Sequence, residues 1–408
     1  MKKLALCLLL SCSVVVSVHA EDGAVKRCVP IGKWASSSGK QLNTQEVIKS
    51  LSKKSVVLIG EDHDNPEHHR MQLYTMAELY ARNPNMILGF EAFPRSVQKV
   101  LDKWVAGELT EDEFFKQTRW DEVWHFNKSY YLPMFEFARM NKIPMLALNV
   151  EQKLVMQVSM KGWDNVDKKM KEGISKPAPA SKDYQEVLAE VYAQHMPKHS
   201  HDAASGKSAD ASDKELQEIL KKPSFIKFVQ GQLVWDRAMG QAIAGALDKN
   251  KNALVVGIMG AGHVMGGYGV VHQLRDLKVS SSSIKTLMPW GGLMGCDQLK
   301  DGAFDYAFGV KFVAPSEVAE IDHPRLGVYL ENMDGVLITK IVPGSVADHL
   351  GIKVGDKIIQ MAGRPVKKVM DVVTSVEVTA FGTWLPLQVE RDGKKIDMVA
   401  KFAPKPNK

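Results

Sequence analysis

The sequence predicts an α/β fold: a largely parallel central sheet flanked by helices, followed by a small β-rich domain. Between about residues 50 and 290, short apolar runs alternate with longer helical patterns, which is typical of a parallel sheet. After about residue 300, short alternating strands are separated by Gly-containing turns. The chain of 408 residues is also long enough for more than one domain.

The first twenty residues have the layout of a secretory signal. Two lysines precede an apolar stretch, 4–18, which ends in "VHA" before Glu21. This pattern predicts cleavage after Ala20 and an exported protein that is periplasmic or associated with the outer membrane. The alternative is a lipoprotein, because "LLSC" at 9–12 resembles a lipobox. Membrane association is expected only if Cys12 is lipidated, and the apolar residues after Cys12 do not resemble a polar tether.

Charge and cysteine content restrict the partners. Removing the two lysines of the signal lowers the formal net charge from +6 to +4, and no dense basic stripe follows, so no nucleic-acid partner is expected. Cleavage also leaves two cysteines, Cys28 and Cys296. In an oxidising compartment they predict one disulfide, which would link the N-terminal arm to the segment after the main domain. Free buried thiols are the alternative.

Four apolar runs predict the strands of the main sheet. They are brief, rich in β-formers and bounded by Gly, Pro or Asn. They are "SVVLIG" (55–60), "MILGFE" (86–91), "PMLALN" (144–149) and "ALVVGIMG" (253–260). The first is followed by a helical pattern over 66–82, with Pro66 at its first position and Asn65 as its cap.

Composition divides the chain further. The main domain is expected at 45–295, with a polar insert at 170–214 that contains a helix at about 182–195. A long helical pattern follows over 215–247. A linker at 296–322 and a β-rich domain at 323–403 complete the expected organisation.

Polar side chains follow each predicted strand of the main sheet. Glu61 and His63 follow the first strand, Glu91 ends the second, Asn149 ends the third and His263 follows the fourth. The carboxyl ends of parallel strands meet at one edge of the sheet, where ligands of α/β folds bind. We therefore expect these residues to lie close together, although solvated loops at strand ends are also often polar.

Two carboxylates and two imidazoles have two chemical uses. Glu61, His63, Glu91 and His263 are candidate ligands of a divalent metal ion, because imidazole and carboxylate together suit zinc, manganese or iron. The same four are candidate catalytic residues without metal, with a carboxylate orienting a histidine that takes a proton from water. Glycines at 257, 260 and 262 would allow close approach of the backbone to a ligand.

Two further histidines, His68 and His69, fall in the first turn of the helix over 66–82. The positive end of a helix favours their neutral form. The alternative is that both are surface residues.

Several motifs, in order along residues 50–290, resemble the ChaN family of the haem-binding-uptake/Tiki superfamily. They are "LIGEDHDNPEHH" (58–69), "GFE" (89–91), Trp124, Tyr131 and Pro133, "LALN" (146–149), Gln230, Trp235, Asp236 and Met239, and "GAGHV" (260–264). The resemblance implies a haem-binding protein of iron acquisition, with haem pairs held between the subunits of a homodimer by tyrosine. Wider relatives include Tiki metalloproteases and erythromycin esterases, whose histidine and glutamate sites resemble Glu61, His63, Glu91 and His263.

Tyr130 and Tyr131, in "HFNKSYYLPM", are the candidate haem ligands, with His125 and Met134 nearby in sequence. The alternative is that both tyrosines pack on a helix. Covalent attachment of a c-type haem is not expected, since the sequence contains no CxxCH motif.

Three histidines of the polar insert are candidates for a second metal site, and the alternative is that they are exposed to solvent. His195 and His199 have the spacing of one helix face, but Pro197 separates them, and His201 follows in the same polar segment.

The C-terminal region resembles a PDZ domain of the type associated with bacterial proteases. "RLGVYL" resembles the carboxylate-binding loop, so Leu326, Gly327 and Val328 are candidate peptide-binding residues, and a helix at about 369–379 would form the other wall of the groove. Such domains bind a protein C-terminus by adding it as a strand to the sheet edge. Docking within its own protein is the alternative.

Three functions remain open at this point. The first is a haem-binding protein whose PDZ-like domain recruits a partner. The second is a metal-dependent or histidine-based hydrolase. The third is an interaction scaffold with a degenerate site.

Overall fold

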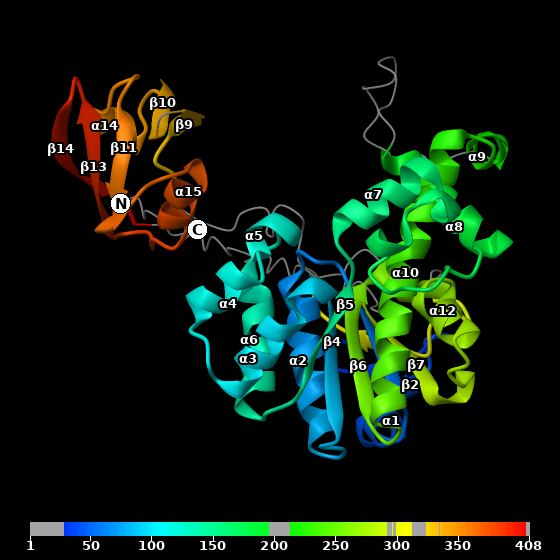
Figure 1. Ribbon diagram of the computed structural model, residues 1–408. Coiled ribbons are helices and arrows are strands. Elements are labelled where there is room, and N and C mark those ends of the chain that lie inside the picture. Colours follow the sequence, from blue (N-terminus) through cyan, green and yellow to red (C-terminus); the bar gives the residue numbers. More distant parts are fainter. Residues whose placement is uncertain are drawn as a thin grey trace, which may run out of the picture. The chain divides into compact units, whose positions relative to one another are not determined.

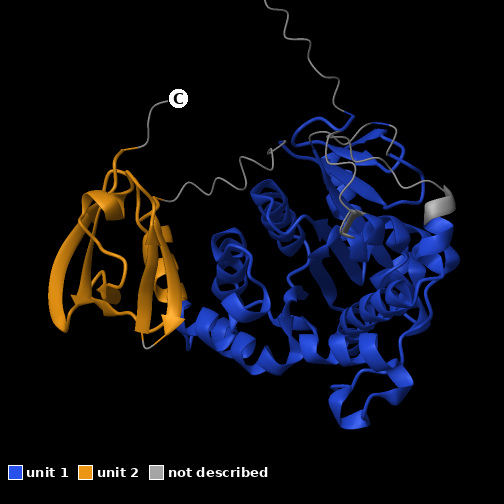
Figure 2. Cartoon of the chain, turned by 90° about the horizontal axis from the view of Figure 1, so that it is seen from above, with its two compact units in different colours: residues 1–312 blue, residues 313–408 orange. Residues whose placement is uncertain are grey.

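The computed structural model describes residues 28–195, 213–291, 296, 299–311, 324–333 and 335–404. Two compact units are separated at residue 312 (Figure 2). The expected signal peptide with Cys12, the histidines His199 and His201, and much of the expected linker lie outside the described residues. Within the described ranges, no helix combines the length and apolar character needed to cross a bilayer.

The four strands predicted from the sequence are neighbours in one parallel arrangement. The order β3–β6–β4–β5 runs through the centre and one edge of an eight-stranded sheet. These strands span β3 (Val56–Glu61), β6 (Leu254–Gly260), β4 (Met86–Pro94) and β5 (Met145–Asn149). All four therefore end at the same edge of the sheet.

The sheet continues beyond the strands that the sequence predicts. On the other side of β3 lie β7 (Ile284–Trp290), β8 (Tyr306–Gly309), β1 (Trp34–Ser36) and β2 (Gln41–Leu42). Strand β8 falls in the range expected as a linker, and β1 and β2 precede the expected start at 45. Each of these three has four residues or fewer, too short to give a periodic signal.

A disulfide joins the N-terminal arm to the segment after β7. Cys28 and Cys296 are bonded, with 5.3 Å between their Cα atoms. The predicted pairing is therefore confirmed. Beside it, Gly32 donates its amide to the carbonyl of Gly309, which places the arm against the end of β8.

Helices cover both faces of the sheet (Figure 1). Alternate residues of β3 divide between two cores: Val57 and Ile59 pack on one face, and Val56 and Leu58 on the other. The first face is covered by α1 (Thr44–Leu51), α2 (Pro66–Tyr80), α3 (Gln98–Ala106), α4 (Glu111–Gln117) and α6 (Lys128–Met140). The second is covered by α10 (Pro223–Lys249), α11 (Ala261–Val264) and α12 (Val270–Asp276).

Helix α2 begins where the sequence predicts. Pro66 is its first residue, and the side chain of Asn65 caps it by accepting the amide of Glu67 at 3.0 Å. This cap fixes the direction in which the chain leaves β3, and so the positions of the polar residues between strand and helix.

The polar insert contains the expected helix, α8 (Lys182–His195). With α7 (Gln152–Lys161) and α9 (Asp213–Leu220), it packs around the N-terminal half of α10. A separate small core that includes Tyr184, Leu188 and Phe225 joins α8 to α10. The insert is thus partly structured and anchored to the main domain.

Within residues 324–333 and 335–404, the C-terminal unit is an antiparallel sheet with two short helices. Its strands follow the order β14–β13–β11–β10–β9, so β9 (Val328–Met333) is an edge strand. The other elements are β10 (Gly335–Ile341), α14 (Val346–His349), β11 (Lys357–Met361), β12 (Arg364–Pro365), α15 (Val369–Glu377), β13 (Trp384–Arg391) and β14 (Lys394–Lys401). The predicted fold class is confirmed for both units.

Candidate functional site

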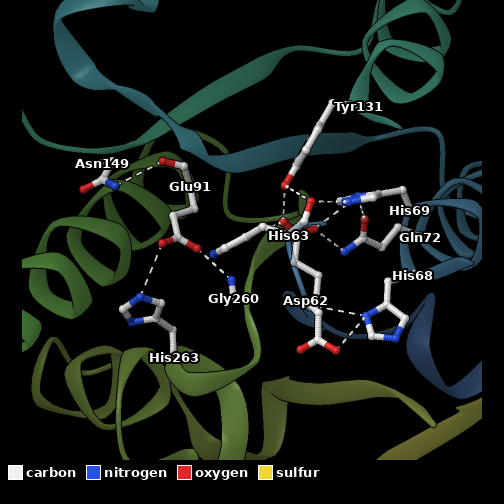
Figure 3. A network of polar contacts seen from close by, with 11 residues as sticks. Asp62, His63, His68, His69, Gln72, Glu91, Tyr131, Asn149, Gly260 and His263 are labelled. Atoms are coloured by element: carbon white, nitrogen blue, oxygen red, sulfur yellow. Dashed lines mark hydrogen bonds and ion pairs between the residues drawn. The ribbon is translucent and has the colours of Figure 1, made fainter. Parts of the chain in front are cut away.

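The structure brings together the residues that were predicted to meet at the sheet edge: Glu61, His63, Glu91, Asn149 and His263. Figure 3 labels His63, Glu91, Asn149 and His263, and Asn149 donates its side-chain amide to the Glu91 carbonyl at 3.1 Å. Glu61, the last residue of β3, lies opposite Gly260, the last residue of β6, in their parallel pairing. Glu91 is in the neighbouring strand β4, and His263 follows β6 in α11. Residues some two hundred positions apart in the chain therefore face one buried region.

Glu61 is the centre of one half of the site. Its carboxylate is 2% exposed and accepts three hydrogen bonds: Nδ1–H of His63 at 2.7 Å and the Tyr131 hydroxyl at 2.6 Å on Oε1, and Nε2–H of Gln72 at 2.7 Å on Oε2. His63 is the more open partner, with a quarter of its side chain exposed, and its ring packs against Trp124. The Glu61 carboxylate thus fixes the ring of His63 through Nδ1, and Nε2 points away from Glu61.

These contacts keep Glu61 ionised. Burial alone would raise the pKa of its carboxyl, but the hydrogen bond from His63 and the nearby His69 lower it. Burial would lower the pKa of His63, yet the Glu61 hydrogen bond and the charge of Glu91 raise it above the usual value. The pair therefore favours a carboxylate beside a protonated or readily protonated imidazole.

The second half of the site is built around His263. Its Nδ1–H donates to Oδ1 of Asp236 at 2.7 Å, and its Nε2 lies 3.3 Å from Oε1 of Glu91. The other oxygen of Glu91 accepts the amide of Gly260 at 2.7 Å. His263 is therefore held between two buried carboxylates, one from β4 and one from α10.

These charges stabilise one another. Burial would lower the pKa of His263, but Glu91 and Asp236 raise it to about 10. Burial would raise the pKa of Glu91, but His263 and the Gly260 amide lower it to about 2. At neutral pH this half of the site contains an imidazolium between two carboxylates.

Gly260 separates the two halves. A Cβ added there would lie 3.0 Å from Nε2 of His63 and 3.6 Å from Oε2 of Glu91. His63 and Glu91 therefore both lie beside this glycine, and a side chain at this position would require the ring of His63 to shift.

The two histidines of α2 are buried, so the surface interpretation is wrong. His68 is 6% exposed, and its Nδ1 accepts the amide of Asp62 at 2.9 Å. Its pKa is lowered to about 4, mainly by burial and then by His69. The neutral form of His68 that was expected from the helix end is therefore favoured mainly by burial instead. His69, 2% exposed, donates Nε2–H to the carbonyl of His63 at 3.0 Å.

The two candidate haem ligands, adjacent on α6, lie in different environments. Tyr131 is 1% exposed and donates to Glu61; burial and that carboxylate raise the pKa of its phenol. Tyr130 is half-buried, and its ring stacks on His69 with 5.8 Å between centroids. In the described part of the chain, no hydrogen bond is made by the Tyr130 hydroxyl. Burial, then Asp64, raises the pKa of its phenol.

Three contributors to the site were not predicted from the sequence. Asp236 on α10 and Gln72 on α2 are fully buried, and Tyr184 on α8 donates its hydroxyl to Oδ2 of Asp236 at 2.8 Å. Asp236 belongs to a family-like motif, "WD", and that motif was the available signal. Gln72 lies eleven residues after Glu61, on the helix face that looks back at the strand.

The metal interpretation has no support from the arrangement of side chains. Within the described ranges, no group of three or more His, Cys, Asp or Glu residues is placed to hold one metal ion. Glu61, His63, Glu91 and His263 instead contact one another or Asp236 in pairs. The side chain of His195 at the end of α8 is not described.

The loop before β9 and the start of that strand contain the three residues that were predicted to bind a peptide carboxylate, Leu326, Gly327 and Val328. Gly327 has a φ of 82°, which favours glycine, and Leu326 is buried in the core of this unit. Within residues 324–333 and 335–404, the amides of Leu326 and Gly327 donate to no acceptor. Helix α15 begins beside β9, where the amide of Val369 donates to Asn332 at 2.8 Å.

Comparisons with known proteins support two family assignments. Residues 47–274 match the family model described as "Haem-binding uptake, Tiki superfamily, ChaN", and residues 324–401 match the PDZ domain model. The first match covers more than half of the chain.

Individual relatives are more distant. A solved structure entitled "Cofacial heme binding to ChaN of Campylobacter jejuni" is 18% identical, with a TM-score of 0.49, over 67% of this chain and 95% of that one. Among curated proteins, a PDZ domain-containing protein of Caenorhabditis elegans is 48% identical over 60 residues, which are 15% of this chain and 44% of that protein. The HhoB protein of Synechocystis sp. is 29% identical over 126 residues, covering 23% of this chain and 30% of that protein.

The chain spans less than half the length of these two curated relatives, so they describe only part of it. The family model, the parallel sheet and the motifs at its carboxyl edge agree with one another. The chain belongs to the ChaN family of haem-binding proteins in the Tiki superfamily, and it carries a C-terminal PDZ domain.

Proposed function

We propose that this protein binds haem outside the cytoplasm, takes part in iron acquisition, and uses its PDZ domain to bind a partner's C-terminus. The observation that carries the haem proposal is the family match together with Tyr130, a half-buried tyrosine whose hydroxyl makes no hydrogen bond within the described residues. The family resemblance adds that two copies of the chain would hold a pair of haems between them.

Tyr130 fits the role of an axial ligand. Its ring is supported from one side by the buried His69, and its hydroxyl makes no hydrogen bond within the described residues. Tyrosinate is a known ligand of ferric haem. Bound iron(III) would supply the charge that stabilises the phenolate, which the raised pKa of the free phenol otherwise disfavours.

Tyr131 is less suited to ligation. Its hydroxyl lies 2.6 Å from Glu61, and its ring is enclosed by Trp120 and Phe135. Exposing it to iron would leave a buried carboxylate without one of its three donors. We therefore assign Tyr131 to support of the Glu61 carboxylate and Tyr130 to haem.

Export is supported by two features. The N-terminal segment has the layout of a secretory signal, and the first described cysteine is disulfide-bonded to Cys296. Disulfides persist in oxidising compartments and are rare in the cytosol. Both agree with a periplasmic or outer-membrane-associated protein.

The PDZ domain supports partner binding through an open strand edge. Among the described strands, β9 pairs only with β10, so its outer edge is available for an added strand. Tyr329 and Met333 on β9 are exposed. The free amides of Leu326 and Gly327 would receive the terminal carboxylate. A peptide ending in a free carboxylate should bind, and the same peptide with a C-terminal amide should not.

Absorbance titration with ferric haem tests the main proposal. The mature chain should give a Soret band that shifts on binding, and Tyr130→Phe should weaken binding at least tenfold. Tyr329→Phe, which changes an exposed tyrosine in the other unit, is the control and should behave like the parent. Equal binding by Tyr130→Phe and the parent would remove Tyr130 from the haem site.

A second candidate function, histidine-based hydrolysis, is favoured by one observation. Glu61 holds Nδ1–H of His63, while Nε2 and the Glu91 carboxylate both lie beside Gly260, which is the arrangement of a base that activates water. The raised pKa of His63 would move base activity to higher pH and would extend its protonated, acid form to higher pH as well. A metal-assisted version would require the four side chains to turn toward one ion.

Elemental analysis of the purified mature chain separates the versions of this second function. Retained stoichiometric metal that is lost in both Glu61→Ala and His63→Ala would support metal-assisted chemistry. Metal that is equally retained by both variants would place the ion elsewhere in the chain.

A further inference from the structure

The buried site contains two tyrosine–carboxylate–histidine series. On one side, the Tyr131 hydroxyl donates to Glu61, which accepts Nδ1–H of His63. On the other side, the Tyr184 hydroxyl donates to Asp236, which accepts Nδ1–H of His263. The two tyrosines come from different helices, α6 and α8, and α8 belongs to the polar insert.

The second series is closed to solvent. Tyr184 is 1% exposed and Asp236 is 0% exposed, and burial together with the Asp236 charge raises the pKa of the Tyr184 phenol. The hydroxyl is therefore a proton donor to Asp236 and keeps its own proton. Stacking of the Tyr184 ring on Tyr268, with 6.1 Å between centroids, fixes the ring that carries it.

The groups around Asp236 restrict the orientation of its carboxylate. A Cβ added to Gly269 would lie 2.7 Å from Oδ1 of Asp236, so backbone already encloses one side of this carboxylate. Its two oxygens are divided between two donors, Nδ1 of His263 at 2.7 Å and the Tyr184 hydroxyl at 2.8 Å. Removing the hydroxyl would leave the buried, charged Oδ2 without its donor, so one of the two hydrogen bonds that hold the carboxylate in place would be lost.

We propose that Tyr184 is a positioning residue for His263: its hydroxyl holds the Asp236 carboxylate in the rotamer that directs Nε2 of His263 at Glu91. Helix α8 is thereby a component of the site rather than a peripheral insertion. The groups that face His263 are Glu91 from β4, Asp236 from α10 and His63 from the turn after β3. The inference concerns how His263 is held and does not depend on which ligand the protein binds.

Proton NMR of the full mature chain tests this directly. The Nδ1–H of His263, hydrogen-bonded to a carboxylate, should give a far-downfield resonance that is identified by its loss in His263→Gln. Tyr184→Phe should move this resonance and make its exchange with water roughly tenfold faster, as expected for loss of one hydrogen bond's stabilisation. Unchanged position and exchange in a folded Tyr184→Phe would overturn the proposal.

Two variants separate positioning from packing. Tyr192→Phe removes another hydroxyl of α8, one that contacts Ser224 at 2.8 Å, and should leave the resonance unchanged. Leu188→Ala weakens the core between α8 and α10 without touching the hydroxyl, and should lower the melting temperature with little change in the resonance. A resonance that responds equally to Leu188→Ala and Tyr184→Phe would contradict a specific role of the hydroxyl.

If Tyr184→Phe does not fold, labelling with 3-fluorotyrosine gives the same test in the native chain. Fluorination makes the phenol a stronger donor, so the His263 resonance should shift relative to the unlabelled protein. No shift in the folded, labelled protein would overturn the proposal.

Discussion

The Cα of Gly260 faces the imidazole of His63: a side-chain carbon added to Gly260 would lie 3.0 Å from Nε2 of that ring. The contact follows from the parallel pairing of β3 with β6, which sets Glu61 opposite Gly260. His63 is the most exposed of the four clustered side chains, so it is the one able to move when the space is filled.

Gly260→Ala is therefore expected to displace His63 and to lower the free energy of unfolding by about 1–3 kcal/mol, the usual range for overpacking. Gly262→Ala is the matched control, because nothing lies within 4 Å of its added Cβ, and it should be neutral or slightly stabilising. Urea unfolding measures the difference in stability. Equal stability of the two variants would show that the space beside His63 is larger than the structure indicates.

The His263 and Glu91 pair gives stability two pH limits. The pKa of Glu91 is lowered from 4.5 to about 2 on folding, so its contribution is present above pH 4.5 and is lost as the pH falls toward 2. The pKa of His263 is raised from 6.5 to about 10, so its contribution is present below pH 6.5 and is lost as the pH rises toward 10.

Between pH 6.5 and 10 the free energy of unfolding should fall by on the order of a few kcal/mol because of His263. His263→Gln should reduce that slope and leave the part that comes from His63, whose pKa is also raised. His272→Gln, which changes a histidine that contacts the Pro179 carbonyl, should retain the full slope. The measurement is urea unfolding at several pH values. An equally steep slope in His263→Gln would place the titrating group elsewhere.

Glu61→Gln is expected to be strongly destabilising, by about 3–5 kcal/mol, because it breaks a buried, charged network. Both oxygens of Glu61 accept hydrogen bonds, whereas glutamine has an amide group in place of one oxygen. The N–H of that amide would face a donor instead of accepting from it: the Tyr131 hydroxyl, Nδ1–H of His63 or Nε2–H of Gln72. Glu122→Gln, at an exposed position of α5 (Trp120–Val123), is the control and should change stability by less than about 0.5 kcal/mol. Similar effects of the two changes, measured by thermal unfolding, would argue against the network.

The disulfide should stabilise the main unit. Cys28 and Cys296 are 268 positions apart, so their bond constrains a very long loop of the unfolded chain. Replacing both with serine is expected to cost about 2–4 kcal/mol. The mature chain should contain no free thiol when it is isolated from an oxidising compartment. Thiol labelling without reductant checks this, and labelling at Cys296 would contradict the pairing.

In the PDZ domain, Gly327→Ala should abolish binding of a free C-terminal carboxylate. The added Cβ would lie 2.2 Å from Cβ of Ser345, and the φ of 82° is unfavourable for alanine. Gly393→Ala has a comparable φ of 73° with nothing within 4 Å, so it controls for backbone strain alone. Fluorescence titration with a labelled peptide should show binding only for the control, and binding by Gly327→Ala would move the carboxylate site away from this loop.

The sequence predicted those residues of the site that lie at the ends of the parallel strands. Glu61, Glu91 and His263 follow or end apolar runs, and parallel strands bring such ends to one edge whatever their separation in the chain. Asp236 and Tyr184 lie inside helices. In the sequence, a buried polar residue of a helix cannot be distinguished from an exposed one until its hydrogen-bond partner is known. The burial of His68 likewise depends on the amide of Asp62, a contact that spacing alone does not reveal.

The central strands of the sheet were predicted from the sequence, whereas the short strand β8 was not. The long apolar runs around Leu58 and Val256 gave the central strands, because residues buried on both faces form continuous apolar segments. Strand β8 has only four residues, too few for the alternating pattern of a strand to be recognised, so its segment resembled a linker. Its place in the sheet follows from pairing with β7 and β1, which is tertiary information.

Coordination of haem iron by Tyr130 can be read from resonance Raman spectroscopy of the ferric complex, because the spectrum reports the axial ligand itself. Iron–tyrosinate bands are expected in the parent and in Tyr131→Phe, and they should be lost in Tyr130→Phe. A complex ligated by histidine, or iron–tyrosinate bands that persist in Tyr130→Phe and disappear in Tyr131→Phe, would contradict coordination by Tyr130.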